Sequence, residues 1–350
     1  NMTIKTFYYG IWLVFSSSNS ISGNNITANN WYGIRLVFSS GDSISGNNIT
    51  ANNGYGILLE YSSSNSISGN NITANNGYGI LLDSSSSNSI SGNNITANNE
   101  EGIWLYSSSS NSISRNNVTN NGYGIWLDSS SNNTIFHNNF VNNSVQVYSN
   151  GSVNIWDDNY PSGGNYLSDY IGVDLYSGIY QNMAGSDGIG DTSRTIDADN
   201  VDKYPLMGLV NAFDIGTWNG TACNVDVVSN TAVSNFQLNV AKKIMSFNVT
   251  GIDFTADFCR VTIPNVIVQD LWHRNYAVLL NSEPWFFRNW TDTTNTYVYI
   301  NYTHTEHEIT IVPEFPSILI LPLFALTTLI ATILLKKKRK PKLQSVSCYW

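Results

Sequence analysis

Hydrophobic residues recur along the first part of the chain in a pattern with a period of 23 residues. The third copy reads Ile57 and Leu59, then Ile67, then Ile72, each flanked by polar residues. A Gly-Ile pair marks every copy, at Gly10, Gly33, Gly56, Gly79, Gly102 and Gly124, and only the last step is 22 residues. Alternation over short runs broken by Gly, Asn and Ser is typical of β-strands. A fixed period of this length predicts a solenoid.

Three short strands and three turns in each copy predict one coil of a parallel β-helix, with about six coils over residues 10–142. Equivalent residues of neighbouring coils should then lie about 4.8 Å apart. We expect two interior columns: Ile21, Ile44, Ile67, Ile90, Ile113 and Ile135, and Ile26, Ile49, Ile72, Ile95, Val118 and Phe140. Asparagines recur too, with Asn75 repeated as Asn98 and Asn120. We expect them at corners, in the left-handed backbone conformation, bonding amide to amide between coils.

The pattern changes after the repeats, and it divides the chain into five parts. Residues 1–150 are predicted to be the β-helix, and the aromatic, Gly-rich residues 151–210 its cap. Short alternating strands about ten residues apart indicate a β-sandwich over residues 211–312. Residues 313–340 and a tail, 341–350, complete the chain. The predicted fold class is all-β with one C-terminal transmembrane helix.

The transmembrane prediction rests on Phe315–Leu335, which contains no charged residue and is long enough to span a bilayer. Five basic residues, 336–340, follow directly, so the tail should be cytoplasmic and the rest of the chain outside, as a single-pass cell-surface protein. No signal peptide precedes the first repeat, and we interpret the sequence as truncated at its N-terminus.

Composition and cysteine content narrow the functional classes. The net charge is −9 and charged residues are 12%, so no nucleic-acid partner is expected. Cys223 and Cys259 form a disulfide on an exported protein or remain two buried thiols. Four asparagines are candidate glycosylation sites: Asn219, Asn248, Asn289 and Asn301.

Two acidic, Gly-containing loops in the cap are candidate Ca²⁺ sites. Their carboxylates are Asp187, Asp191, Asp197, Asp199 and Asp202. The alternative is that these residues form Asx turns with their own backbone. No other cofactor is expected.

Two outward columns carry the candidate chemistry of the β-helix. Glu60 and Asp83 should be neighbours, as a catalytic carboxylate pair would be, but no basic residue flanks their column and the coils are nearly identical. We therefore expect no catalysis. The second column reads Trp12, Arg35, Leu58, Leu81, Trp104 and Trp126, and exposed indoles suit stacking on sugar rings. The alternative is that the cap, the sandwich or another envelope protein covers this column.

The repeats, together with the stretch from Asn154 to Met207, resemble the NosD-type proteins of the group of carbohydrate-binding and sugar-hydrolase repeats. The resemblance implies a right-handed parallel β-helix, and the family name implies periplasmic copper delivery. Copper sites use His, Cys or Met, and the repeats offer only His137. The motif Pro313-Glu314-Phe315-Pro316 is similar to the PEF-type sorting signals of archaeal surface proteins.

The prediction from sequence is therefore a membrane-anchored, extracytoplasmic β-helix protein that binds polysaccharide or has a structural role in the envelope. A copper-binding maturation factor and a polysaccharide lyase or glycoside hydrolase are the alternatives.

Overall fold

The computed structural model describes residues 1–253, 255–303 and 306–314. Within these residues the N-terminal half of the chain forms three parallel sheets. Sheet A contains β1 (Thr3–Lys5), β4 (Asn25–Thr27), β7 (Asn48–Thr50), β10 (Asn71–Thr73), β13 (Asn94–Thr96), β16 (Asn117–Thr119), β19 (Asn139–Val141) and β21 (Tyr166–Leu167). Sheet B contains β2 (Ile11–Val14), β5 (Ile34–Val37), β8 (Ile57–Glu60), β11 (Ile80–Asp83), β14 (Ile103–Tyr106), β17 (Tyr123–Asp128) and β20 (Val145–Asn150). Sheet C contains β3 (Ser20–Ser22), β6 (Ser43–Ser45), β9 (Ser66–Ser68), β12 (Ser89–Ser91), β15 (Ser112–Ser114) and β18 (Thr134–Phe136).

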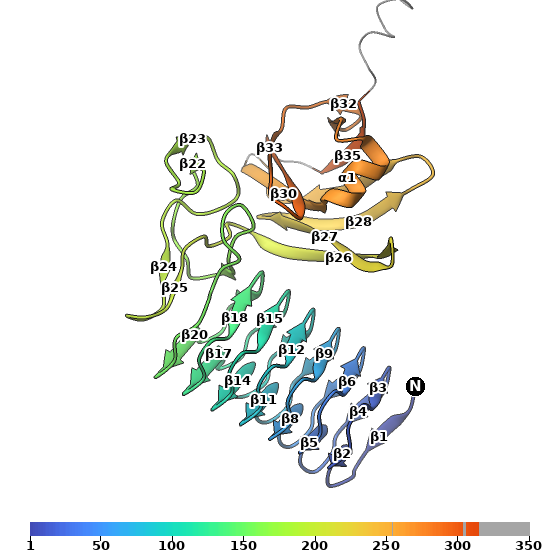
Figure 1. The fold of residues 1–350 in the computed structure, drawn as a ribbon, viewed down its shortest axis with the longest axis vertical. Helices are drawn as coiled ribbons and strands as arrows, with labels where there is room; N and C mark the ends of the chain where they lie inside the picture. The colour runs from blue at the N-terminus through green and yellow to red at the C-terminus, as the bar shows by residue number, and fades with distance from the viewer. Residues whose placement is uncertain (254, 304–305, 315–350) are drawn as a thin grey trace, which may run out of the picture.

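The sheets stack as a parallel β-helix of about seven turns (Figure 1). Equivalent residues pair in register, as Ile67 does with Ile90 and Ile72 with Ile95. Both predicted interior columns are buried, which confirms the interior pattern read from the sequence. The predicted number of coils was too low, because β20 and β21 continue sheets B and A into the residues that follow the last clear repeat.

The Gly of each Gly-Ile pair is explained by close packing between coils. A Cβ atom on Gly79 would lie 2.5 Å from the carbonyl oxygen of Gly102 and 2.6 Å from Cγ2 of Ile95. No side chain fits at that distance, so the repeat requires glycine here.

The corners correct one expectation about asparagine. In the third copy, three left-handed residues stand directly before a recurring asparagine: Ser64, Gly69 and Ala74. A fourth, Tyr61, stands before Ser62. The asparagines themselves are not left-handed there. At the asparagine corners the turn is thus made by a small residue, and the next side chain is directed toward the neighbouring coil.

The bonds between asparagines are confirmed. Both the backbone N–H and the side-chain amide of Asn75 donate to Oδ1 of Asn98, at 3.1 and 2.9 Å. Asn98 donates in the same way to Asn121, so the expectation that Asn120 continues this column was wrong. Asn120 instead takes the left-handed position of Ala97. The residue missing from this copy is therefore lost after the ladder position and not before it.

The cap closes the core and ends the asparagine ladders. Trp156 and Leu167 are buried in the same hydrophobic cluster as the interior columns. One ladder passes through Asn165, whose backbone N–H donates to Asp202 at 2.8 Å. Another passes through Asn154, whose backbone N–H donates to Asn200 at 2.9 Å. Two short antiparallel pairs complete the cap: β22 (Tyr176–Ser177) with β23 (Met183–Ala184), and β24 (Arg194–Thr195) with β25 (Val201–Asp202).

Two five-stranded antiparallel sheets follow and share one core, as predicted for a β-sandwich. The first contains β26 (Leu209–Trp218), β27 (Thr221–Ser229), β30 (Ala256–Pro264), β34 (Asn295–Thr303) and β33 (Arg288–Thr291). The second contains β28 (Ala232–Asn239), β29 (Ile244–Thr250), β35 (His307–Pro313), β31 (Tyr276–Leu280) and β32 (Glu283–Pro284). The helix α1 (Asn265–Trp272) was not predicted; it buries Ile267, Val268, Leu271 and Trp272.

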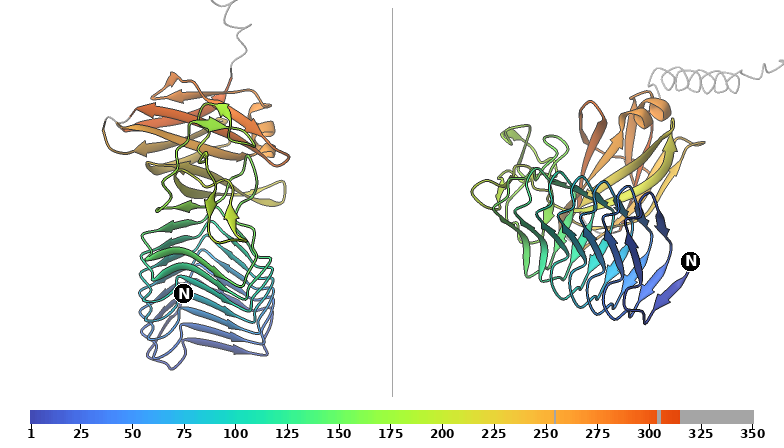
Figure 2. Two further views of the ribbon diagram at one scale, coloured as in Figure 1. Left: turned by 90° about the vertical axis from the view of Figure 1, so that its left-hand side faces the viewer. Right: turned by 60° about the horizontal axis from the view of Figure 1, so that its bottom comes forward.

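The sandwich lies against one side of the β-helix (Figure 2). Asn139 of β19 exchanges two hydrogen bonds with the backbone of Val210, at 2.9 and 2.8 Å. The guanidinium of Arg260 donates to the backbone carbonyls of Pro161 and Ser162 in the cap. These contacts leave sheet B on the side of the β-helix that faces away from the sandwich (Figure 1).

The disulfide alternative was wrong, since Cys223 and Cys259 are both free and buried. The register of β27 with β30 places Ser229, six residues beyond Cys223, opposite Cys259. The predicted membrane span, the basic cluster and the last two residues of the PEF motif lie outside the described residues. Among the described residues, no helix is both long and apolar enough to cross a bilayer.

Candidate functional site

Sheet B has an outward face rich in aromatic side chains. The column predicted from sequence to point outward does so, and it continues from Trp126 to Tyr148 of β20. Trp12 is 53% exposed and Tyr148 41%, whereas Leu58 and Leu81 are only 3% and 7% exposed. The expected continuous apolar stripe is therefore interrupted in its middle.

A column of tyrosines also lies on this face. Tyr9, Tyr32, Tyr55 and Tyr78 precede the Gly-Ile pairs, and successive ring centroids are 5.5, 4.7 and 4.5 Å apart. This tyrosine column lies beside the tryptophan column, because Tyr9 contacts Trp12 and Tyr78 contacts Trp104. Tyr55 and Tyr78 precede Leu58 and Leu81 by three residues, as Tyr9 precedes Trp12.

Trp104 and Trp126 form the centre of the aromatic face. Their ring centroids are 6.1 Å apart, with planes inclined by 45°. Tyr123 and Tyr148 pack on Trp126 at 4.9 and 5.1 Å. Neither indole N–H of this pair has a hydrogen-bond partner among the described residues, although both are buried. Buried donors are normally satisfied, so two unused donors side by side are an unusual feature of this surface.

Glu101 was missed by the sequence analysis. It stands directly before Gly102, where the neighbouring copies have Tyr78 and Tyr123, and it is only 8% exposed. No hydrogen bond from another described residue reaches its carboxyl group, and burial raises its pKa. The departure of Glu100-Glu101 from the Gly-Tyr of the repeat was the signal that could have identified it.

The carboxylates Glu60 and Asp83 are register partners in β8 and β11, as predicted. The statement that no basic residue flanks them was wrong, because Arg35 lies one coil away. Its Nε donates to Oε2 of Glu60 at 2.5 Å, and its Nη1 donates to the hydroxyl of Tyr9 at 3.1 Å. Asp83 accepts a hydrogen bond from Ser84. Glu60 is thus held in an ion pair with Arg35, which does not fit the hypothesis that Glu60 and Asp83 form a free catalytic pair.

The structure does not bring the five acidic residues of the cap into one site. Asp197 accepts hydrogen bonds from the backbone of Asp199 and from Asn200, as in an Asx turn. Asp191 accepts two backbone N–H groups, from Leu175 and Tyr176. Asp187 accepts the backbone N–H of Ile189.

Asp202, the fifth of these residues, accepts the backbone N–H of Asn165 at the end of an asparagine ladder. It is fully buried beneath Asn165, and burial raises its pKa to about 8. In the described part of the chain, no three His, Cys, Asp or Glu side chains are placed to hold a metal ion together.

The described histidine and cysteine residues considered for copper do not lie together either. His137 is buried at the boundary with the sandwich, with Nδ1 at 3.7 Å from Asp226 and Nε2 at 3.2 Å from the carbonyl oxygen of Ser162. Burial lowers its pKa. Cys223 and Cys259 lie apart in the sandwich. These residues do not fit a copper site.

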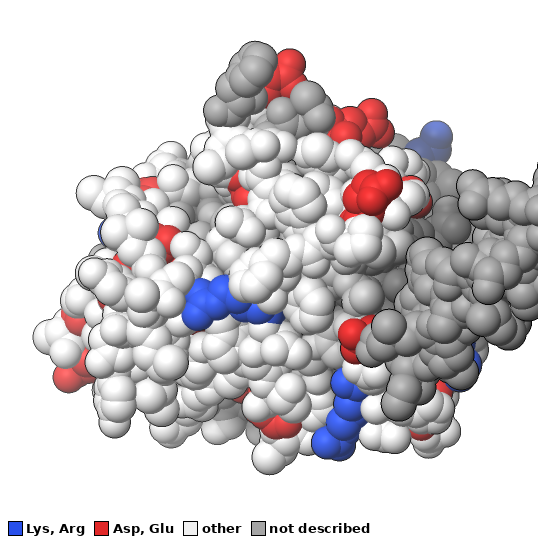
Figure 3. Space-filling model, turned by 90° about the horizontal axis from the view of Figure 1, so that it is seen from above, with Lys and Arg blue, Asp and Glu red and all other residues white. Residues whose placement is uncertain are grey.

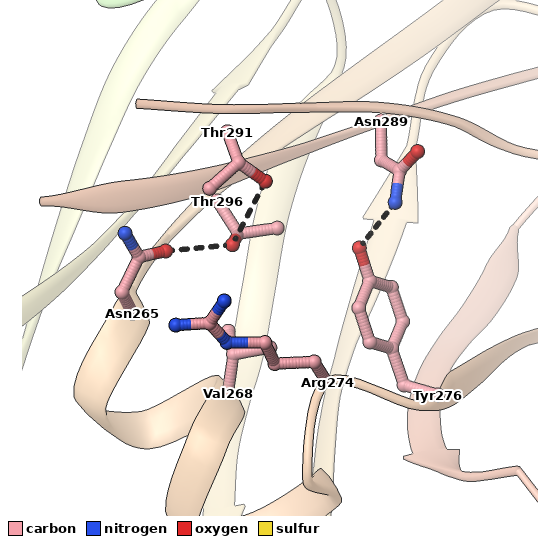
Figure 4. Close-up of a pocket in the computed structure, with 7 residues that line it drawn as sticks. All are labelled: Asn265, Val268, Arg274, Tyr276, Asn289, Thr291 and Thr296. Atoms are coloured by element: carbon pink, nitrogen blue, oxygen red, sulfur yellow. Dashed lines mark hydrogen bonds between the residues drawn. The ribbon is translucent and has the colours of Figure 1, made fainter. Parts of the chain in front are cut away.

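Cavities lie in the sandwich and along its boundary with the β-helix, and they range from about 190 to 460 Å³. One, of about 190 Å³, is lined by Asn265, Val268, Arg274, Tyr276, Asn289, Thr291 and Thr296 (Figure 4). Its hydroxyl and amide groups bond to each other, with Thr296 donating to Asn265 at 2.8 Å and Asn289 to the Tyr276 hydroxyl at 3.0 Å. Ligand pockets are usually about 300–1,000 Å³, so this cavity is not the candidate site.

The surface of the sandwich side carries scattered charges without a continuous basic patch (Figure 3). Of the candidate glycosylation sites, Asn219, Asn289 and Asn301 are exposed and Asn248 is half-buried. The side-chain amide of Asn289 is engaged with Tyr276.

The repeats match the model of one protein family. Residues 1–172 of the 350 match the model of the family described as periplasmic copper-binding protein (NosD). The β-helix region is therefore similar to the NosD family. No match was found among curated proteins.

Solved structures also resemble the β-helix of this chain. A double mutant of the periplasmic alginate epimerase AlgG is 24% identical, covering 50% of this chain and 44% of its own, with a TM-score of 0.41. The Dettilon tailspike protein is 14% identical, covering 88% and 65%, with a TM-score of 0.38. The tailspike protein gp49 of Pseudomonas phage LKA1 is 9% identical, covering 85% and 67%, with a TM-score of 0.29. The chain spans less than half the length of the epimerase, and these likenesses concern the fold alone.

Proposed function

We propose that this protein is an extracytoplasmic, non-catalytic β-helix protein that binds polysaccharide along the outward face of sheet B. The observation that carries the proposal is the pair Trp104 and Trp126, whose rings are half-buried on that face with their centroids 6.1 Å apart. The exposed parts of aromatic rings stack on the apolar faces of sugars.

The placement of the face supports this proposal. The sandwich contacts the β-helix through Asn139, Arg115 and the cap, and none of the ring contacts or hydrogen bonds of the aromatic side chains on sheet B involves the described residues of the sandwich. The face is therefore open along several coils, which suits an extended polymer better than a small molecule. Anchoring through Phe315–Leu335 would hold such a binding domain at the cell surface.

The absence of catalysis is part of the proposal. Glu60 is paired with Arg35, and a polysaccharide hydrolase needs two carboxyl groups free to exchange protons with the substrate. The aromatic side chains extend along many coils and are not gathered around the Glu60–Asp83 pair, as expected for a binding surface.

Affinity electrophoresis through gels that contain polysaccharide tests the proposal. The full chain should be retarded by at least one polysaccharide, and the double variant Trp104→Ala/Trp126→Ala should migrate as in an empty gel. The matched control is Trp285→Ala/Phe286→Ala, which removes two exposed aromatic side chains of the sandwich, 42% and 74% exposed. Equal retardation of both double variants, or no retardation of the parent by any polysaccharide tested, would overturn the proposal. Release of reducing ends from the retained polysaccharide would overturn its non-catalytic part.

A further inference from the structure

We infer that the polysaccharide bound on sheet B is uncharged or carries amines, and that carboxylated polysaccharides are rejected. This inference rests on the proposed function and names the class of its ligand. It is drawn from the charges that border the aromatic face and from the place of Glu101 within it.

Carboxylates outnumber cations on this face. Glu60, Asp83 and Asp128 are the last residues of β8, β11 and β17 in sheet B. Glu100 and Glu101 replace the Gly-Tyr pair at the position of the tyrosine column. Arg35 is the cation of the face among the described residues of sheet B. Repulsion between like charges acts across such a surface and sets the specificity of the contact more than its affinity.

Arg35 is not free to bind an anionic ligand. Its guanidinium is held by Glu60 at 2.5 Å and by the hydroxyl of Tyr9 at 3.1 Å. It also lies over the rings of Tyr9, Trp12 and Tyr32, at 5.4, 5.6 and 6.0 Å from their centroids. A carboxylated sugar would have to displace Glu60 to reach it. The remaining four carboxylates have no cationic partner among the described residues.

Glu101 gives the centre of the face a hydrogen-bonding group that suits hydroxyls and amines. It takes the position of a tyrosine in the tyrosine column, three residues before Trp104, and this position packs on the outward column, since the rings of Tyr123 and Trp126 are 4.9 Å apart. A sugar hydroxyl both donates and accepts, and an ammonium group donates to a carboxylate with the strength of a charge-assisted bond. A carboxylate on the ligand would find an anion at the same place.

Matched pairs of polymers test the inference, because each pair shares a backbone and differs in charge. The probes are fully methyl-esterified homogalacturonan against polygalacturonate, hydroxyethyl cellulose against carboxymethyl cellulose, and chitin oligomers against chitosan oligomers. The full chain should bind an uncharged or amine-bearing member at least tenfold more tightly than a carboxylated polymer at low salt. This ratio should shrink as salt rises, because the screening length falls from ~10 Å at 0.1 M to ~3 Å at 1 M.

The variant Glu101→Gln, which preserves shape, and the variant Asp83→Asn/Asp128→Asn should each reduce the ratio. Equal or tighter binding of the carboxylated polymers by the parent would overturn the inference while leaving the proposed function intact. A ratio that does not respond to salt would also overturn it, since steric exclusion would then explain the preference. Failure of every polymer to bind would overturn the proposed function itself.

Discussion

Arg115 of the β-helix and Asp226 of the sandwich form an ion pair across the boundary between the two units. Nε of Arg115 donates to both carboxylate oxygens of Asp226, at 3.0 and 2.9 Å, and its Nη2 lies 2.8 Å from Oδ2. The side chain of Asp226 is 3% exposed and that of Arg115 is 29% exposed. Arg115 stands at the corner where the preceding copies have a left-handed glycine, Gly92, and it has the same conformation.

Arg115→Ala should lower the free energy of unfolding by about 2–3 kcal/mol, because it leaves the carboxylate of Asp226 buried without its cation. Removing one partner of a fully buried pair costs about 3–5 kcal/mol, and the partial exposure of Arg115 reduces this value. The control is Arg194→Ala, whose pair with Asp169 is exposed and should contribute about 0–1 kcal/mol. Urea unfolding measures both, and equal losses for the two variants would show that the boundary pair is not special.

The asparagine ladders supply a second prediction from two adjacent residues. Asn93 is buried; its side-chain amide donates to Ile67 and to Asn116, and its Oδ1 accepts from Asn70. Asn94 is exposed and bonds to Asn71 and Asn117 on the outside of sheet A.

Asn93→Ala should cost at least about 3 kcal/mol, because it leaves several buried groups without partners at about 1–3 kcal/mol each. Asn94→Ala should change the free energy of unfolding by about 0.5 kcal/mol or less, as surface substitutions usually do. Thermal and chemical unfolding of the two variants provide the comparison. Similar effects at both positions would mean that the ladders contribute little to stability.

Asp202 predicts a pH dependence of stability. Burial raises its pKa to about 8 in the folded chain, while an unfolded Asp has a pKa of about 3.9. Between these values the folded state holds a proton that the unfolded state releases, so this group makes stability fall as pH rises. The slope is at most about 1.4 kcal/mol per pH unit.

Asp202→Asn removes this slope. The variant should be about 1 kcal/mol less stable than the parent near pH 4, because its amide has one acceptor oxygen for the two backbone N–H groups, of Asn165 and Tyr204, that Asp202 accepts. The difference should shrink or reverse toward pH 8. Unfolding free energies measured from pH 4 to pH 8 test this. Asp174, whose pKa is raised to about 7 by burial, contributes a slope of the same sign that remains in the variant. Parallel curves for parent and variant would contradict the assignment to Asp202.

The repeat made the fold predictable, because periodicity reports which side chains share an environment. Ile67, Ile72 and their equivalents identified the interior, and Trp104 and Trp126 identified the outward face, without knowledge of any distance. The sandwich strands were likewise visible in alternation such as Phe247 and Val249.

The corners and the centre of the site were less predictable for physical reasons. The propensity of Asn for the left-handed backbone pointed to the wrong residue, because cross-coil hydrogen bonds hold the asparagine and the small residue before it takes the strain. Arg35 and Glu60 belong to neighbouring coils and to different outward columns, so their ion pair cannot be found by following one column along the sequence. Glu101 departs from the repeat, and a periodic pattern predicts only the residues that recur.

Oxidative footprinting of the tryptophans shows whether polysaccharide binds on sheet B. The full chain is oxidised briefly by hydroxyl radicals with and without the polysaccharide that retards it, and the modification of each tryptophan is quantified by mass spectrometry. Bound polysaccharide should protect Trp104 and Trp126 and leave Trp285 of the sandwich unchanged. Protection of Trp285 with no change at Trp104 and Trp126 would contradict the proposed function, because the binding surface would then lie on the sandwich and not on sheet B.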